Sequence, residues 1–218
     1  CDDDGGATDD GGATDDGGAT DDGGATDDGG ATDDGGATDD GGATDDSTPA
    51  GCSVTTVKCH TPTADGYLGG GSVVYPTGPG PLALPLGRDN SNRELRFMVS
   101  CDLSSAVSET QEVRSAVMRL KYGTKEGNPT FGANRVAADL SPAFGGSTVL
   151  TKDDFSASAY TSSVLSSVSF DSSNDMTATL KSDSLSSLNR CGANQLRFRL
   201  TALPSSKDTS MHWYASDG

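Results

Sequence analysis

The first 46 residues of this chain lack basic residues, aromatic residues and large aliphatic residues. They hold 17 aspartates, so 32 − 17 = 15 acidic residues remain to balance the 15 Lys and Arg of residues 47–218. The whole formal net charge of −17 therefore lies in this N-terminal tail. Ordering a backbone costs roughly 1–2 kcal/mol per residue, and these side chains bury too little apolar surface to offset it. We expect the tail to depend on neighbouring molecules or attached groups for any fixed shape.

Other absences exclude whole classes of function. No basic stripe is present to neutralise nucleic-acid phosphates. No apolar run approaches the roughly 20 residues needed to span a bilayer. The chain has two histidines and shows no Gly-x-Ser-x-Gly, His-Glu-x-x-His or phosphate-cradling motif, so we expect it not to be an enzyme.

The tail is built from one hexapeptide. Residues 3–44 are seven copies of Asp-Asp-Gly-Gly-Ala-Thr. In polyproline II, six residues make two turns, so all the threonines share one face, roughly 19 Å apart. No Asn-x-Ser/Thr sequon with x other than Pro occurs, so any glycan must be O-linked. The candidate sites are Thr8, Thr14, Thr20, Thr26, Thr32, Thr38 and Thr44.

The aspartate pairs also suggest that the tail binds cations or serves as a plain spacer. Their spacing matches neither an EF-hand nor an RTX repeat, so we expect weak calcium binding and no defined metal site or other cofactor. A solvated, self-repelling spacer is the simplest alternative. Fully extended, the tail would reach about 150 Å.

Four of the five cysteines, Cys52, Cys59, Cys101 and Cys191, follow the tail. In a secreted protein they would form two disulfides. Of three possible pairings we favour Cys52 with Cys59, which closes a short loop, and Cys101 with Cys191. A zinc site on Cys59 and His60 is the alternative, although CxxC and HxxxH spacings are absent.

Cys1 stands where a methionine would be expected. A mature bacterial lipoprotein begins with a lipidated cysteine, so Cys1 is a lipidation candidate; a fragment start is the alternative.

Residues 47–63 form a linker, and residues 64–218 suit one all-β domain. Short runs rich in β-branched and aromatic residues alternate with Gly and Pro breakers, which predicts a two-sheet jelly-roll sandwich. One helical turn is expected at Leu185–Leu188. The predicted strands are Ser53–Lys58, Ser72–Tyr75, Leu82–Leu86, Glu94–Cys101, Val113–Tyr122, Asn134–Leu140, Val164–Asp171, Met176–Lys181, Gln195–Leu203 and Met211–Ala215.

Several of these runs resemble one family. They are similar to motifs of the DNRLRE-domain family, a set of bacterial extracellular jelly-roll modules related to alginate-binding carbohydrate modules. The similar segments are Arg88–Phe97, Asp102–Ser105, Val113–Leu120 and Gln195–Leu200. The resemblance spans about Ala64 to Gly218. It implies an extracellular or cell-surface protein that binds polysaccharide, with contacts among exposed aromatics and arginines. The candidates are Tyr67, Arg135, Trp213 and Tyr214; core packing is the alternative for each.

The sequence departs from the family at two places. Val99–Cys101 lengthens one strand, and the family's last strand is missing, which would leave an open sheet edge. Ser53–Lys58 has the β-branched character to fill it, either within the chain or in a neighbour, which would make a head-to-tail homopolymer. We therefore favour a non-catalytic extracellular fibre subunit with an O-glycosylated tail. The alternative is a surface lipoprotein with an alginate-type carbohydrate-binding module, touching the membrane only through Cys1.

Overall fold

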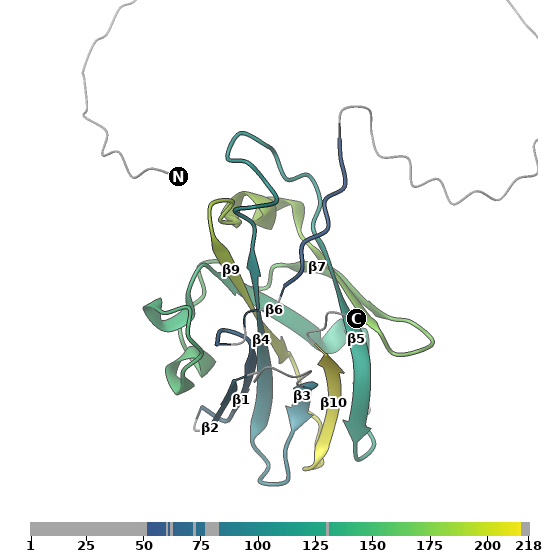
Figure 1. Ribbon diagram of the computed structural model, residues 1–218. Coiled ribbons are helices and arrows are strands. Elements are labelled where there is room, and N and C mark those ends of the chain that lie inside the picture. The colour runs from purple at the N-terminus through teal and green to yellow at the C-terminus, as the bar shows by residue number, and fades with distance from the viewer. Residues whose placement is uncertain are drawn as a thin grey trace, which may run out of the picture. The chain divides into compact units, whose positions relative to one another are not determined.

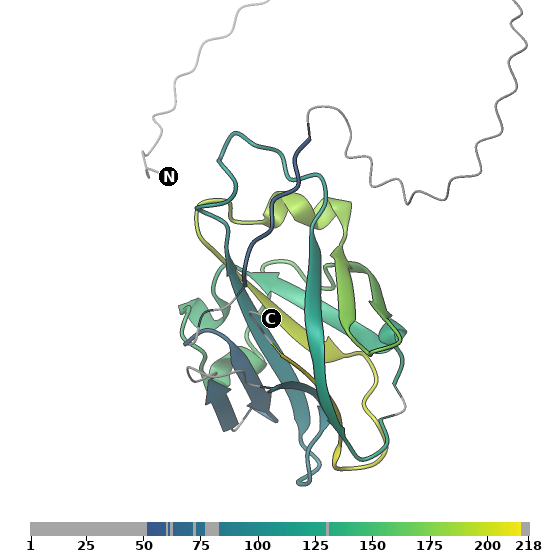
Figure 2. The ribbon, with the colours of Figure 1, turned by 45° about the vertical axis from the view of Figure 1, so that its right-hand side comes forward.

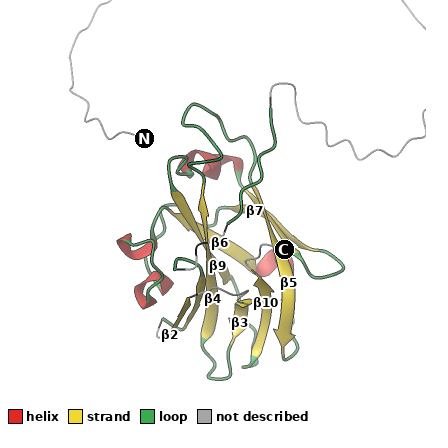
Figure 3. Cartoon of the chain, viewed as in Figure 1, coloured by secondary structure: helices red, strands yellow, loops and turns green. Residues whose placement is uncertain are grey.

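The computed structural model describes residues 52–59, 61, 63–71, 73–76, 83–129 and 131–214. The repeat tail, Cys1 and His60 lie outside these residues. The described chain forms ten β-strands and four short 3-10 helices, and the compact unit begins at Thr55 (Figure 1 and Figure 3). The predicted all-β, jelly-roll-like sandwich is confirmed.

The strands form two layers that belong to one continuous sheet. One layer contains β1 (Gly66–Gly69), β2 (Val73–Pro76), β4 (Glu94–Asp102), β6 (Val136–Ser141) and β9 (Ala193–Leu200). The other contains β3 (Ala83–Arg88), β5 (Val117–Glu126), β7 (Leu165–Phe170), β8 (Met176–Leu180) and β10 (Thr209–Tyr214).

The sheet passes from one layer to the other on both sides of the sandwich. At the start of β4, Glu94 pairs with Arg88 of β3, while the later residues of β4 pair with β9 instead. On the opposite side, Thr161 bridges Leu140 of β6 just before the chain enters β7. The sheet therefore nearly closes on itself, which leaves few unpaired strand edges.

The main core lies between the layers and is built by alternating residues of each strand. Phe97 of β4 stacks on Phe198 of β9, with ring centroids 4.6 Å apart, and Trp213 of β10 lies 6.3 Å from Phe97. All three side chains are fully buried. Burying large aromatic groups contributes most of the hydrophobic stabilisation of a domain of this size.

A second, smaller core explains why β4 and β9 are buried on both faces. Residues 142–160, here called the strap, contain the 3-10 helices η2 (Phe144–Gly146) and η3 (Lys152–Phe155). Phe144 and Leu150 of the strap cover Leu68 of β1 and Met98 of β4. The outer face of this layer is therefore covered by the strap.

Most predicted strands are present, with shifted ends. The predicted strand Ser53–Lys58 is wrong, because residues 52–59 have no regular secondary structure. The strand β1, at Gly66–Gly69, was not predicted, since its two glycines hide the pattern. The helical turn expected at Leu185–Leu188 overlaps the 3-10 helix η4, which spans Ser182–Ser187 and has Leu188 as its C-cap.

The unpaired sheet edge that the missing last strand would leave is not found beside β10, the last described strand. β10 pairs with β3 along one edge and with β5 along the other. Among the described strands, β2, β6 and β7 each pair with a single other strand. The position predicted to need a donor strand is therefore filled by the chain itself.

Candidate functional site

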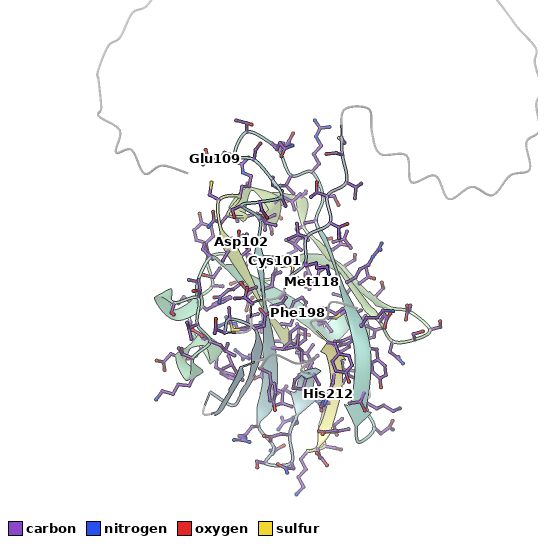
Figure 4. The ribbon with its side chains drawn as sticks, viewed as in Figure 1. Cys101, Asp102, Glu109, Met118, Phe198 and His212 are labelled. Carbon is purple, nitrogen blue, oxygen red and sulfur yellow. A yellow bond between two sulfur atoms is a disulfide. The ribbon has the colours of Figure 1, made fainter. Side chains whose placement is uncertain are left out.

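One disulfide joins the segment before the sandwich to the end of β4. Cys59 and Cys101 are bonded, with an S–S distance of 2.04 Å. The favoured pairings of Cys52 with Cys59 and of Cys101 with Cys191 are therefore wrong. The register of the sheet explains why: β4 and β9 place Cys101 opposite Asn194 rather than Cys191. Figure 4 shows Cys101 near the upper end of the domain.

The Asp65 carboxylate fixes the same segment a second time. Asp65 is fully buried, and its Oδ2 accepts a hydrogen bond from the Thr61 backbone N–H at 2.8 Å. Its Oδ1 accepts one from the Ser100 N–H at 2.6 Å. Ser100 precedes the bonded Cys101, so the disulfide and Asp65 hold the chain at adjacent residues of β4. We call this pair of attachments the N-terminal clamp.

The carbohydrate-contact candidates do not converge. Trp213 is fully buried in the main core, and its Nε1 donates to the Asn174 carbonyl at 3.0 Å, so this candidate is wrong. Tyr67 is half-buried on β1, where it packs against the main core. Arg135 is exposed in the 3-10 helix η1 (Ala133–Arg135), which precedes β6.

Tyr214 points to the opposite face of β10 from Trp213, as neighbouring strand residues do. It is half-buried, and Lys121 of β5 is its cross-strand partner. A Cβ atom placed on Gly123 would lie 2.8 Å from Tyr214 Cε2, so the tyrosine ring rests directly against this glycine. This is the one carbohydrate-contact candidate that combines an aromatic ring with an adjacent cation on an open strand face.

Ser210, His212 and Glu126 form a polar cluster. Figure 4 shows His212 in the lower part of the view, below Cys101. His212 Nε2 lies 2.7 Å from Ser210 Oγ and 3.8 Å from Glu126 Oε2. A catalytic triad needs the serine and the acid on different ring nitrogens, whereas both groups here face Nε2. Ser210 is also fully buried, so the cluster does not present a nucleophile. Burial lowers the pKa of His212, which the nearby Glu126 carboxylate only partly opposes.

A second polar network attaches the strap to β9. Arg197 is buried, and its Nη1 donates to the carbonyls of Asp154 and Ala157 at 2.6 and 2.8 Å. Its Nη2 donates to Asp139 Oδ2 at 3.2 Å, and the guanidinium carbon lies 4.4 Å from the centre of the Phe144 ring. This network holds the strap in place.

Two carboxyl groups of this network have opposite pKa shifts. Burial acts to raise the pKa of Asp139, but hydrogen bonds from the Ser163 N–H, Arg199 and Arg197 bring it below the ordinary value. Burial raises the pKa of Asp154, and its Oδ1 has no hydrogen-bond partner among the described residues. Asp139 is therefore stabilised as a carboxylate, whereas Asp154 is disfavoured as one.

A polar cleft of about 330 Å³ opens at the end of the sandwich near the clamp. It lies between the β4–β5 loop and η4. Arg190 Nη1 donates to the Gln111 carbonyl at 2.7 Å, which joins the two walls. The lining combines three hydroxyls, one guanidinium, one carboxylate and two apolar side chains. The lining residues are Thr110, Glu112, Val113, Ser182, Leu185, Ser186 and Arg190.

Sequence reasoning missed both the cleft and the clamp. Arg190, Ser182 and Thr110 are far apart in the sequence and belong to no motif. Asp65 was also missed, although a lone aspartate just before a Gly-Tyr-Leu-Gly run offered a weak signal of a capped strand start.

No described group can be assigned to a metal. Among the residues that the structure describes, no three His, Cys, Asp or Glu side chains are grouped to hold an ion. No helix in the described part of the chain is long and apolar enough to cross a bilayer. The O-glycosylation candidates and the lipidation candidate Cys1 lie outside the described residues.

No protein-family model matches the chain, and no curated protein matches it either.

Proposed function

We propose that this chain is a non-catalytic extracellular structural subunit, in which a β-sandwich is joined to an acidic, O-glycosylated repeat tail and self-associates into a fibre. The N-terminal clamp is the observation that carries the proposal. It attaches the residues that follow the tail covalently to a central strand, as a protein under tension requires. A disulfide also suits an oxidising compartment outside the cytosol.

The distribution of polar groups supports the same proposal. Asp65, Asp139 and Arg197 are buried, and their hydrogen bonds hold loops or the strap to the sheet. The Ser210 cluster lacks the geometry of a nucleophile site. Buried charged groups used only for attachment are typical of a rigid module rather than of a catalytic centre.

Self-association by strand addition remains part of the proposal, with residues 53–58 as the donor. This segment contains two valines and two threonines, and Val54 is 77% exposed. No described strand of the same chain pairs with it. Since β10 is paired on both edges, the acceptor in a neighbouring copy would be a strand that has a single partner, β2, β6 or β7.

Native mass spectrometry and electron microscopy of the secreted protein test this proposal. We expect filaments and assemblies heavier than one 22.0 kDa chain, with hexose-sized mass increments on the tail peptides. Replacing Thr56 by proline removes a backbone N–H and should abolish filaments, while Thr56→Ala should preserve them. A monodisperse, unmodified monomer would contradict the proposal.

The cleft favours a second candidate, a polysaccharide-binding module on a tether. Its guanidinium and hydroxyl groups could hold the end of an acidic glycan chain. Calorimetric titration with alginate-like polymers tests it, and Arg190→Gln should weaken any binding at least tenfold. Binding that survives unchanged in this variant would remove the cleft from consideration.

A further inference from the structure

The disulfide of the N-terminal clamp closes a large loop. Cys59 and Cys101 are 42 residues apart in the sequence, and their Cα atoms are 4.3 Å apart. The loop contains β1, β2 and β3, which form the first part of the sandwich (Figure 2). Any pull on the tail reaches the domain through residues 55–59, so the position of this disulfide decides which strand receives the force.

Without the disulfide, the weakest element of the sheet would receive the force first. β1 and β2 form a hairpin with four residue pairs, and β2 has no second partner among the described strands. β1 is joined to β4 by four further residue pairs. A pull from the N-terminal side would break the Asp65 hydrogen bonds and then peel this hairpin away one pair at a time.

The disulfide instead transfers the force to β4. This nine-residue strand pairs with β1 on one edge and with β3 and β9 on the other. Six of its residues pair with β9, and Phe97 and Met98 are fully buried in the two cores. Removing β4 would disrupt both cores at once, so it should resist far more force than the terminal hairpin.

We propose that the Cys59–Cys101 disulfide is a mechanical bypass, which passes tension from the tail to β4 and keeps residues 60–100 folded under load. Because a disulfide can be reduced, the extensibility of the subunit then depends on its redox state. This inference rests on the proposed role as a subunit under tension.

Single-molecule force spectroscopy of the full chain, pulled between peptide handles at its two ends, tests the bypass. In the oxidised protein we expect one main rupture and no earlier low-force event from the domain. After this bond is opened we expect an added low-force event and a contour-length gain larger by about 150 Å, since 42 residues extend by roughly 3.6 Å each. A reductant also opens the disulfide of Cys191, so variants are needed to assign the gain to Cys59 and Cys101.

Two variants separate this disulfide from other thiols. Replacing Cys59 and Cys101 together by serine should reproduce the reduced behaviour without a reductant, whereas Cys52→Ser should leave the oxidised behaviour unchanged. If the double variant does not fold, the single variants Cys59→Ser and Cys101→Ser give the comparison, since each removes this bond and leaves the disulfide of Cys191 in place. Equal first-rupture forces and equal contour lengths with and without the disulfide would overturn the bypass.

The outcome is independent of the filament experiment. Monomers in electron micrographs would remove the proposed fibre but would leave the force measurement intact. Filaments built from subunits that unravel at low force while oxidised would remove the bypass alone.

Discussion

Arg197 and Asp139 form an ion pair that is almost closed to solvent. Arg197 Nη2 lies 3.2 Å from Asp139 Oδ2, and the two side chains are 6% and 5% exposed. Arg199 Nε lies 3.2 Å from the same oxygen, so one carboxylate is shared by two guanidinium groups of β9. Of these two arginines, only Arg197 also donates hydrogen bonds to strap carbonyls, so we expect it to contribute more to the stability of the domain.

Replacing Arg197 by alanine should therefore destabilise the domain strongly. The change leaves a buried carboxylate with one cation and frees the strap carbonyls, and breaking buried pairs of this kind costs about 3–5 kcal/mol. Arg199→Ala is the matched control and should cost less than half as much, because its side chain is 26% exposed. Denaturant unfolding measures both, and equal losses would contradict the role of Arg197 in holding the strap.

Asn substitutions at Asp139 and Asp154 should have different consequences for stability. Asp139 has a lowered pKa in the fold, so its charge stabilises the protein above the ordinary pKa of 3.8 and this contribution is lost as the pH falls. Asp139→Asn should therefore lower stability at neutral pH and flatten the loss of stability in acid.

Asp154 has a raised pKa because it is buried, so its charged form opposes folding at neutral pH. Asp154→Asn keeps an oxygen that can accept from the Thr151 N–H. We expect this variant to be within about 1 kcal/mol of the wild type at pH 7. Thermal unfolding from pH 3 to 7 compares the two variants, and similar profiles would contradict the different environments of the two carboxyls.

His212 should make the domain less stable as the pH falls below about 6.5. Burial lowers its pKa in the fold from the model-compound value of 6.5, so the unfolded chain takes up a proton first and gains stability relative to the fold. Glu126 lessens the shift but does not cancel it.

The variant His212→Gln should remove this slope between about pH 6.5 and the lower folded pKa, whereas His60→Gln should keep it. Stability measured by urea unfolding at half-unit pH steps distinguishes them. A slope that is unchanged in His212→Gln would assign the titration to another group.

Gly87 should tolerate no side chain. Its φ is 141°, and a Cβ atom there would lie 2.1 Å from the Thr209 carbonyl oxygen, where β3 meets β10. Gly87→Ala should cost about 2–4 kcal/mol from overpacking and backbone strain together. Gly146→Ala is the control, since its φ is also positive at 80° but nothing lies within 4 Å. A similar loss in both variants would attribute the effect to backbone conformation alone.

Hydrophobic alternation was enough to predict the class of fold. Leu95, Phe97 and Val99 alternate along β4, and Leu196, Phe198 and Leu200 do so along β9, and these residues meet between the layers as a half-buried pattern indicates. The same pattern concealed the second core, because Met98 and Arg197 look like solvent-facing positions until the strap covers them.

The disulfide pairing and the strand expected at residues 53–58 were mispredicted for a related reason. Cysteine spacing favours short loops, but the pairing here is decided by which segment the sheet register brings beside Cys101. Val54 and Val57 have the β-branched character of a strand, yet the edges of β10 are already occupied within the chain. Local propensity cannot report such tertiary competition.

The cross-link between Cys59 and Cys101 also determines where a truncated version of the protein should begin. Closing a loop of 42 residues lowers the entropy of the unfolded ensemble by an amount worth about 4 kcal/mol in the chain-entropy treatment. A truncated version that starts at Ala64 would lose this contribution together with the Thr61 partner of Asp65, whereas one that starts at Thr55 would keep both.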